Sequence, residues 1–217
     1  MVQKKNVLAY EILREKILTG KLQPGVNLDI DELSTDFGMS STSIQEALQQ
    51  LESDSLVTIA AHGAQVTKIH LELFQEIFEV LTSLQIISGR AACQKMNEVD
   101  FTELEAMLHR MDGVVDDPEQ WSKYEIELHS RISEKANMPL LKNLLLRTAD
   151  HWQRLRRYCL DEPFASRIPL AQQEYRDFLT TLRTRNSDHV TQLMLEHNQR
   201  ALNDYMAHLN SQEVVQD

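Results

Sequence analysis

Hydrophobic residues recur at helical spacing over the first fifty residues, and short strand-like stretches follow. Residues 4–19 predict a helix that ends just before Gly20, a typical C-terminal stop. Two shorter helical patterns have their apolar residues within 30–37 and 44–51. The stretches that favour strands are residues 27–29, 56–59 and 65–69, with residues 61–64 as the tip between the last two.

Gly38 lies between the two shorter helical patterns, where a turn must permit a positive φ or a close approach of the backbone. Ser40 or Ser41 can cap the helix that follows. A helix, a tight turn, a second helix and a small hairpin together predict a winged helix-turn-helix. The helix that follows Gly38 is then the candidate reader of DNA.

Helical periodicity continues from residue 70 almost to the C-terminus. Prolines and asparagines at the ends of the apolar patterns mark the boundaries. The predicted helices are residues 71–96, 100–111, 118–136, 139–160, 168–185 and 187–209. We therefore expect a mainly α protein, with a winged helix-turn-helix domain over residues 1–69 and an all-helical bundle over residues 70–210. Residues 211–217 have little to bury and are expected to fray.

Charge and cysteine content narrow the class of protein. The 217 residues carry a formal net charge of −11, and residues 1–69 alone carry six basic and nine acidic side chains, a net of −3, so any DNA contact must be local. Cys93 and Cys159 are far apart and lack metal-like spacing, which indicates reduced packing residues. Neither a signal-like segment nor a run of about 18 apolar residues occurs, so we expect a soluble, cytoplasmic protein without a membrane partner.

Three spaced motifs lie in the first quarter of the chain. They are Gly-x-Leu-x-Pro-Gly-x-x-Leu from Gly20, Glu-Leu-(x)4-Gly-x-Ser from Glu32, and Ile-x-Glu-Ala-Leu-x-x-Leu from Ile44. A Leu-Val pair at residue 56 and a Gly-tipped wing follow them. In this order the motifs resemble the N-terminal domain of the GntR superfamily of bacterial transcription regulators, which implies DNA binding.

The resemblance breaks down at the start of the recognition helix. In this superfamily that helix usually begins Ser-Arg-Thr-Pro-Val-Arg-Glu-Ala-Leu, and its arginines contact phosphates and guanine. Residues 40–48 here read Ser-Ser-Thr-Ser-Ile-Gln-Glu-Ala-Leu, so Ser41 and Gln45 replace both arginines. Gln pairs well with adenine, which favours an A·T-rich operator in double-stranded DNA. The candidate DNA-binding residues are Ser41, Thr42, Ser43, Gln45, Gln49, His62 and Gly63. The alternative is a domain that has kept the fold and lost DNA binding.

The helical region has its own resemblance. Residues 125–129 read Glu-Ile-Glu-Leu-His, residues 136–141 read Ala-Asn-Met-Pro-Leu-Leu, and Tyr175 and His197 follow. These features resemble the FCD ligand-binding domain of the FadR subfamily, where Asp-x-x-Phe-His, a Gly-Asn-x-x-Leu turn and two later histidines occur. The resemblance implies a divalent metal, Zn²⁺ or a similar ion, held by Glu125, His129 and His197, with Tyr175 in the place of a third histidine. The alternative is a hydrogen-bonded polar core without metal.

The resemblance also implies a small-molecule effector in the helical domain, with an organic acid as one candidate. The candidate effector-binding residues are Tyr175 and Arg156. The family commonly shows Arg-x-x-Leu-Glu on the first helix of this domain, whereas residues 81–85 here read Leu-Thr-Ser-Leu-Gln. This departure makes the expected pocket less polar and argues against a typical small carboxylate.

Together these patterns predict a ligand-responsive transcriptional regulator, most simply a repressor, that acts as a homodimer on a palindromic operator. Binding of the effector or metal is expected to change its affinity for DNA. One rival is an effector-binding sensor or scaffold that no longer binds specific DNA. A metal-dependent enzyme built on Glu125, His129 and His197 is a weaker rival, because no second catalytic constellation is visible. We therefore expect no enzymatic activity.

Overall fold

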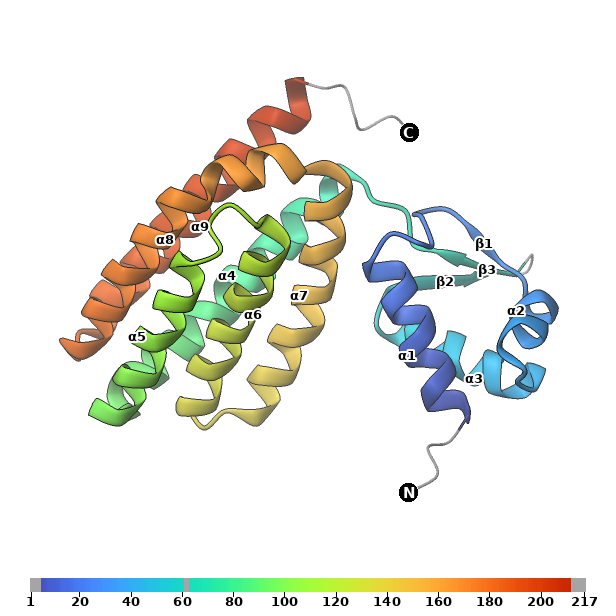
Figure 1. Ribbon diagram of the computed structural model, residues 1–217, viewed down its shortest axis with the longest axis horizontal. Coiled ribbons are helices and arrows are strands. Elements are labelled where there is room, and N and C mark those ends of the chain that lie inside the picture. Colours follow the sequence, from blue (N-terminus) through green and yellow to red (C-terminus); the bar gives the residue numbers. More distant parts are fainter. Residues whose placement is uncertain (1–4, 61–62, 212–217) are drawn as a thin grey trace. The chain divides into compact units, whose positions relative to one another are not determined.

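A computed structural model describes residues 5–60 and 63–211, which divide into two compact units (Figure 1). The first unit takes in the described residues up to His70 together with residues 153–158. The second takes in residues 71–152 and 159–211. Across the described residues, every helix is too short or too polar to span a lipid bilayer.

The first unit is a winged helix-turn-helix, as predicted. Helix α3 packs against α1 and α2, and the small antiparallel sheet has the order β1-β3-β2 (Figure 1). Its elements are α1 (Lys5–Leu18), β1 (Asn27–Leu28), α2 (Ile30–Phe37), α3 (Ser41–Ser53), β2 (Val57–Ala60) and β3 (Gly63–Val66). Apolar residues of the helices and the sheet form a single core; its most deeply buried members include Leu13, Ile17, Ile44, Leu51, Leu56 and Val66.

The wing strands are displaced from their predicted positions. β3 begins at Gly63, which the sequence pattern placed in the tip, and ends at Val66 instead of residue 69. Pairing explains the shift, because Gly63 lies opposite Ala60, and Ala64 lies opposite both Ile59 and Leu28. The ladder therefore continues almost to the tip.

The second unit is an all-helical bundle. Helix α4 packs against α9, α6 and α8, while α5 packs against α6 and α8 (Figure 1). The elements are α4 (Leu71–Lys95), α5 (Glu98–Asp112), α6 (Pro118–Lys135), α7 (Pro139–Cys159), α8 (Asp161–Arg183) and α9 (Ser187–Ser211). Helix α9 thus takes in Ser211, which was predicted to belong to the tail, and the rest of that tail lies outside the described residues.

The start of α8 was predicted wrongly. The helix begins at Asp161 and not at residue 168, so Pro163 is its third residue and does not break it. A proline in the first turn costs no intrahelical hydrogen bond, because the N–H at that position has no partner within the helix. The extra turns bury Phe164 and Arg167, and Pro169 lies inside the helix. Burial of these side chains outweighs the local helix-breaking signal.

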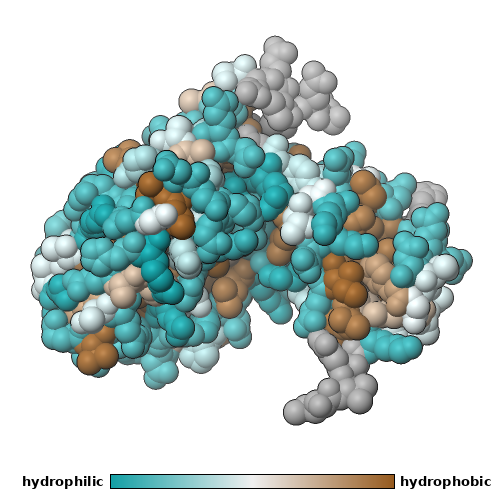
Figure 2. Space-filling view, viewed as in Figure 1, coloured by the Kyte–Doolittle hydropathy of each residue, from teal (hydrophilic) through white to brown (hydrophobic). Residues whose placement is uncertain are grey.

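The visible surface of the second unit is mainly hydrophilic, with small separate hydrophobic areas (Figure 2). Single exposed apolar residues such as Val99 and Leu140 are ordinary on a protein surface. The polar residues of this unit that call for an explanation are therefore the buried ones in its interior.

Candidate DNA-reading helix and ligand cavity

Two capping residues set the position of helix α3. Gly38 ends α2 with φ 61° and ψ 37°, the left-handed conformation that the predicted turn requires. Ser40 then caps α3, because its hydroxyl oxygen accepts a hydrogen bond from the backbone N–H of Ser43 at 3.2 Å. Both caps follow the sequence expectation, and they fix where the exposed face of α3 begins.

Helix α3 turns one face to the core and the other to solvent. Ile44, Ala47, Leu48 and Leu51 are buried. The predicted contact residues on the opposite side are exposed, and these are Ser41, Thr42, Gln45 and Gln49. The face carries hydrogen-bonding groups and, over its described length, no basic side chain.

The remaining three predicted DNA-contact residues need a separate description. Ser43 is half-buried, and its hydroxyl lies 2.9 Å from that of Ser40, so part of its hydrogen-bonding capacity is used by the cap. Gly63 is exposed with φ 120°, a conformation that favours glycine. His62 lies outside the described residues.

Several acidic residues near α3 have partners within the first unit. Asn6 donates to Glu46 at 2.7 Å, the backbone N–H of Ile59 donates to Glu52 at 3.0 Å, and the Tyr10 hydroxyl donates to Asp54 at 2.7 Å. The negative charge of this domain thus includes groups that hold its elements together. Sequence counting alone does not separate these acids from purely solvent-exposed ones.

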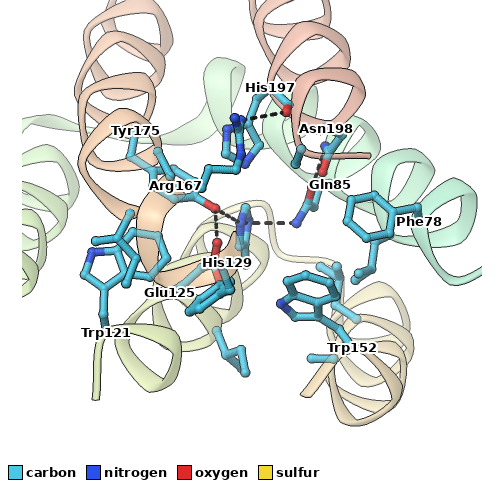
Figure 3. A pocket seen from close by; sticks show the side chains of 18 of the residues that line it. Phe78, Gln85, Trp121, Glu125, His129, Trp152, Arg167, Tyr175, His197 and Asn198 are labelled. Atoms are coloured by element: carbon cyan, nitrogen blue, oxygen red, sulfur yellow. Dashed lines mark hydrogen bonds between the residues drawn. The ribbon is translucent and has the colours of Figure 1, made fainter. Parts of the chain in front are cut away.

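A cavity lies inside the second unit, among helices α4, α6, α7, α8 and α9 (Figure 3). It encloses about 740 Å³ of space between atoms, part of which opens to solvent. Most of its lining is apolar or aromatic. The polar side chains that line it are Gln85, Glu125, His129, Ser130, Arg167, Tyr175, His197, Asn198 and Tyr205.

A chain of hydrogen bonds crosses one wall of the cavity (Figure 3). The Tyr175 hydroxyl donates to Glu125 Oε1 at 2.7 Å, and His129 Nε2 lies 3.0 Å from the same hydroxyl oxygen. His129 Nε2 also lies 3.2 Å from Gln85 Nε2, so this nitrogen donates to the Tyr175 oxygen when it carries the ring proton and accepts from Gln85 when it does not. Further along, Asn198 donates to Gln85 Oε1 at 2.9 Å. This wall is therefore an ordered polar network.

Burial sets the protonation of this network. Burial, together with the neighbouring His197, lowers the pKa of His129 to about 3, so the imidazole is neutral near pH 7. Burial also raises the pKa of Tyr175 well above its ordinary value, and the negative charge of Glu125 and the hydrogen bond to it act in the same direction. Tyr175 is therefore a neutral phenol.

A second cluster surrounds Arg167, whose side chain is only 4% exposed. Its guanidinium donates to Glu174 at 2.9 Å, to Asp204 at 2.9 Å and to the backbone carbonyl of His197 at 3.2 Å. Glu174 also lies 2.6 Å from His197 Nδ1 and accepts from Arg200 at 2.7 Å. Burial opposes ionisation of Glu174, but the hydrogen bond and charge of His197 and the charge of Arg167 lower its pKa overall.

The expected metal ligands are not assembled into a metal site. Among the described residues, no group of three or more His, Cys, Asp or Glu side chains is placed to hold a metal ion. His197 directs Nδ1 at Glu174, while Glu125 and His129 both bond to Tyr175. A neutral phenol is a poor metal ligand, so Tyr175 does not replace the third histidine chemically. The structure instead shows hydrogen bonds that link Glu125, His129 and Tyr175, as in the polar core that the sequence left open, whereas His197 bonds to Glu174.

Of the two predicted effector-binding residues, one lines the cavity. Tyr175 lines the cavity. Arg156 is absent from the lining and belongs to the stretch of α7 that is grouped with the first unit. Leu81 and Gln85, which replace the family's Arg and Glu, both line the cavity as expected. Sequence reasoning missed Arg167, because it placed the start of α8 after this residue. Trp121 and Trp152 were missed as lining residues because aromatic residues at helical spacing are ordinary core.

Comparison with known families assigns both units. Residues 7–65 match the gntR family of bacterial regulatory proteins, and residues 76–200 match the FCD domain. The chain therefore belongs to the GntR family of bacterial transcriptional regulators and carries an FCD domain; it is not a member of an enzyme family.

Particular relatives agree with this assignment. The chain is 23% identical over 194 residues to the uncharacterized HTH-type transcriptional regulator YdhC of Bacillus subtilis, a match that covers 87% of this chain and 85% of YdhC. It is 24% identical over 195 residues to the HTH-type transcriptional repressor RspR of Escherichia coli, covering 88% and 85%. The solved structure of E. coli McbR/YncC has the same fold, with a TM-score of 0.76 and 19% identity over 95% of this chain and 99% of that one.

Proposed function

We propose that this protein is a transcriptional repressor that binds a palindromic operator as a homodimer and releases it when a small molecule occupies the cavity of the FCD domain. The observation that carries the proposal is the exposed polar face of α3, which presents Ser41, Thr42, Gln45 and Gln49 opposite the buried core. Repression is supported by the relative RspR, which is named a transcriptional repressor.

The chemistry of α3 suggests how the operator is read. Glutamine pairs with adenine through two hydrogen bonds in the major groove, so Gln45 and Gln49 favour A·T base pairs. Serine and threonine hydroxyls position the helix against phosphates. Because each neutralised phosphate adds about −0.9 to the salt slope and α3 has no basic residue, affinity depends weakly on salt.

The proposal is tested by selecting fragments of the organism's own genomic DNA that the purified protein retains. We expect a two-fold symmetric sequence with A·T-rich half-sites, and a molar mass in solution twice that of one chain. Failure to enrich any symmetric sequence would favour the rival reading, a sensor without specific DNA binding, which the loss of both recognition-helix arginines supports. Enrichment of G·C-rich half-sites would contradict the roles given to Gln45 and Gln49.

A further inference from the structure

The charges that line the cavity do not favour an acidic ligand. Among the described lining residues, Glu125 is the only carboxylate and Arg167 the only guanidinium or ammonium group. The Arg167 guanidinium already bonds to two carboxylates, Glu174 and Asp204, each at 2.9 Å. A bound carboxylate would therefore enter a cavity whose guanidinium already pairs with two carboxylates, whose other basic side chain, His197, already bonds to Glu174, and whose wall carries Glu125.

The rest of the lining is a set of aromatic rings. Trp152 lies at the centre of the set, with ring centroids 5.2 Å from Phe78, 5.5 Å from Tyr205 and 6.0 Å from Phe164. Trp121 closes the other side, 5.8 Å from Phe164. The faces of such rings carry partial negative charge and attract organic cations, most strongly when water is excluded.

Glu125 is fixed beside these rings. Figure 3 shows it between Trp121 and His129 on helix α6, and the Tyr175 hydroxyl orients it through Oε1. Tyr175, which donates to Glu125, and His129, which contacts Tyr175 in turn, are both neutral groups. A carboxylate whose orientation is fixed in this way is suited to pair with the charge of a cationic ligand.

We propose that the cavity binds a hydrophobic monoamine directly, without a metal ion. The ammonium group pairs with Glu125, and the apolar part of the ligand packs among Trp121, Trp152 and Phe78. This inference rests on the proposed function in one respect, namely that the amine acts as the effector of the regulator. It replaces the organic acid that the family resemblance suggested.

The test compares ligands that differ only in charge. The probes are benzylammonium, 2-phenylethylammonium and 3-phenylpropylammonium, each beside the alcohol and the carboxylate of matched length. The chain has two tryptophans, and both line the cavity, so intrinsic fluorescence reports occupancy directly. We expect at least one ammonium probe to bind about tenfold more tightly than its alcohol, and the carboxylates to bind most weakly. Addition of EDTA should leave these affinities unchanged.

Two variants locate the effect. Glu125→Gln removes the charge and keeps an oxygen that accepts from Tyr175, so it should lower the affinity for the ammonium probe to that for the alcohol and leave the alcohol unaffected. Glu127→Gln is the matched control, because Glu127 lies on the same helix, is absent from the lining and lies 3.9 Å from Arg131. It should behave as the unmodified protein does.

The inference is overturned if no ammonium probe binds more tightly than its matched carboxylate, if Glu125→Gln leaves ammonium binding unchanged, or if EDTA abolishes it. DNA binding is measured separately on the same preparation. Charge-selective binding without DNA binding would refute the proposed function and leave the cavity assignment standing. Specific DNA binding without charge-selective ligand binding would refute the cavity assignment and leave the proposed function standing.

Discussion

At the scale of single residues, burial changes the chemistry of the cavity more than any single hydrogen bond. His129 and Tyr175 lie beside each other, and burial makes both of them neutral over the physiological range. A neutral imidazole and a neutral phenol supply oriented hydrogen bonds without adding charge. In the proposed account Glu125 is therefore the group on this wall that selects a ligand by its charge.

The lowered pKa of His129 makes stability depend on pH. The folded protein binds this proton only near pH 3, whereas the unfolded chain binds it near the ordinary value of 6.5. Between these values the unfolded state holds more protons, so the free energy of unfolding falls as the pH falls. From pH 7 to pH 5 we expect a loss of about 2 kcal/mol from this residue, measured by urea unfolding.

Two variants isolate that loss. His129→Gln should be less stable than the unmodified protein at pH 7, and the difference should shrink by about 2 kcal/mol at pH 5. His109→Gln, at a position 82% exposed, should keep the original pH dependence. Equal pH dependence in the His129 variant and the unmodified protein would show that the imidazole does not titrate as described.

Sequence reasoning found part of the cavity at this scale. The registers of Tyr175 and His197 along their helices place both side chains inward, and both are buried. Of the polar partners of Arg167, Glu174 lies two turns further along the same face of α8, whereas Asp204 comes from another helix and could not be found in the same way. Pairings between helices depend on how the helices pack. The periodicity of apolar residues in the sequence gives no information on that packing.

At the scale of elements, the turn between α2 and α3 decides where the exposed polar face lies. Gly38 has φ 61°, and a Cβ added there would meet no atom within 4 Å. Any cost of a side chain at this position is therefore a cost of backbone conformation and not of crowding.

Gly38→Ala should lower the free energy of unfolding of the first unit by about 1–2 kcal/mol, because alanine is strained in the left-handed region. Denaturant unfolding followed by far-UV circular dichroism measures the change. Gly113→Ala is the control, since Gly113 also ends a helix but has φ −71°. It should change stability little, and an equal loss in both variants would refute the conformational explanation.

Local signals predicted most helices well and failed where packing overrode them. The amphipathic patterns of α1, α4 and α6 end at breakers that the structure respects to within a residue or two. Helix α8 starts earlier than predicted, because burial of Phe164 and Arg167 pulls the Pro163 segment into the helix. The wing strands shifted because their limits depend on cross-strand pairing.

At the scale of the whole molecule, a net charge of −11 coexists with membership in a family of DNA-binding regulators. The acidic surface suppresses indiscriminate attraction to the DNA backbone, so specific contacts must supply a larger share of the affinity. In the proposed account those contacts come from the polar face of α3. In the same account the helical unit, with its cavity lined by aromatic side chains, supplies the response to a small molecule.

The most direct test compares two glutamines on α3 for their effect on operator binding. Gln45 lies on the proposed reading face, and Gln50, also exposed, leaves the helix roughly 140° further round its axis. Fluorescence anisotropy with a labelled operator should show about a tenfold weaker affinity for Gln45→Ala, equivalent to about 1–2 kcal/mol, and little change for Gln50→Ala. If Gln45→Ala binds the operator as tightly as the unmodified protein, α3 does not read DNA through this face.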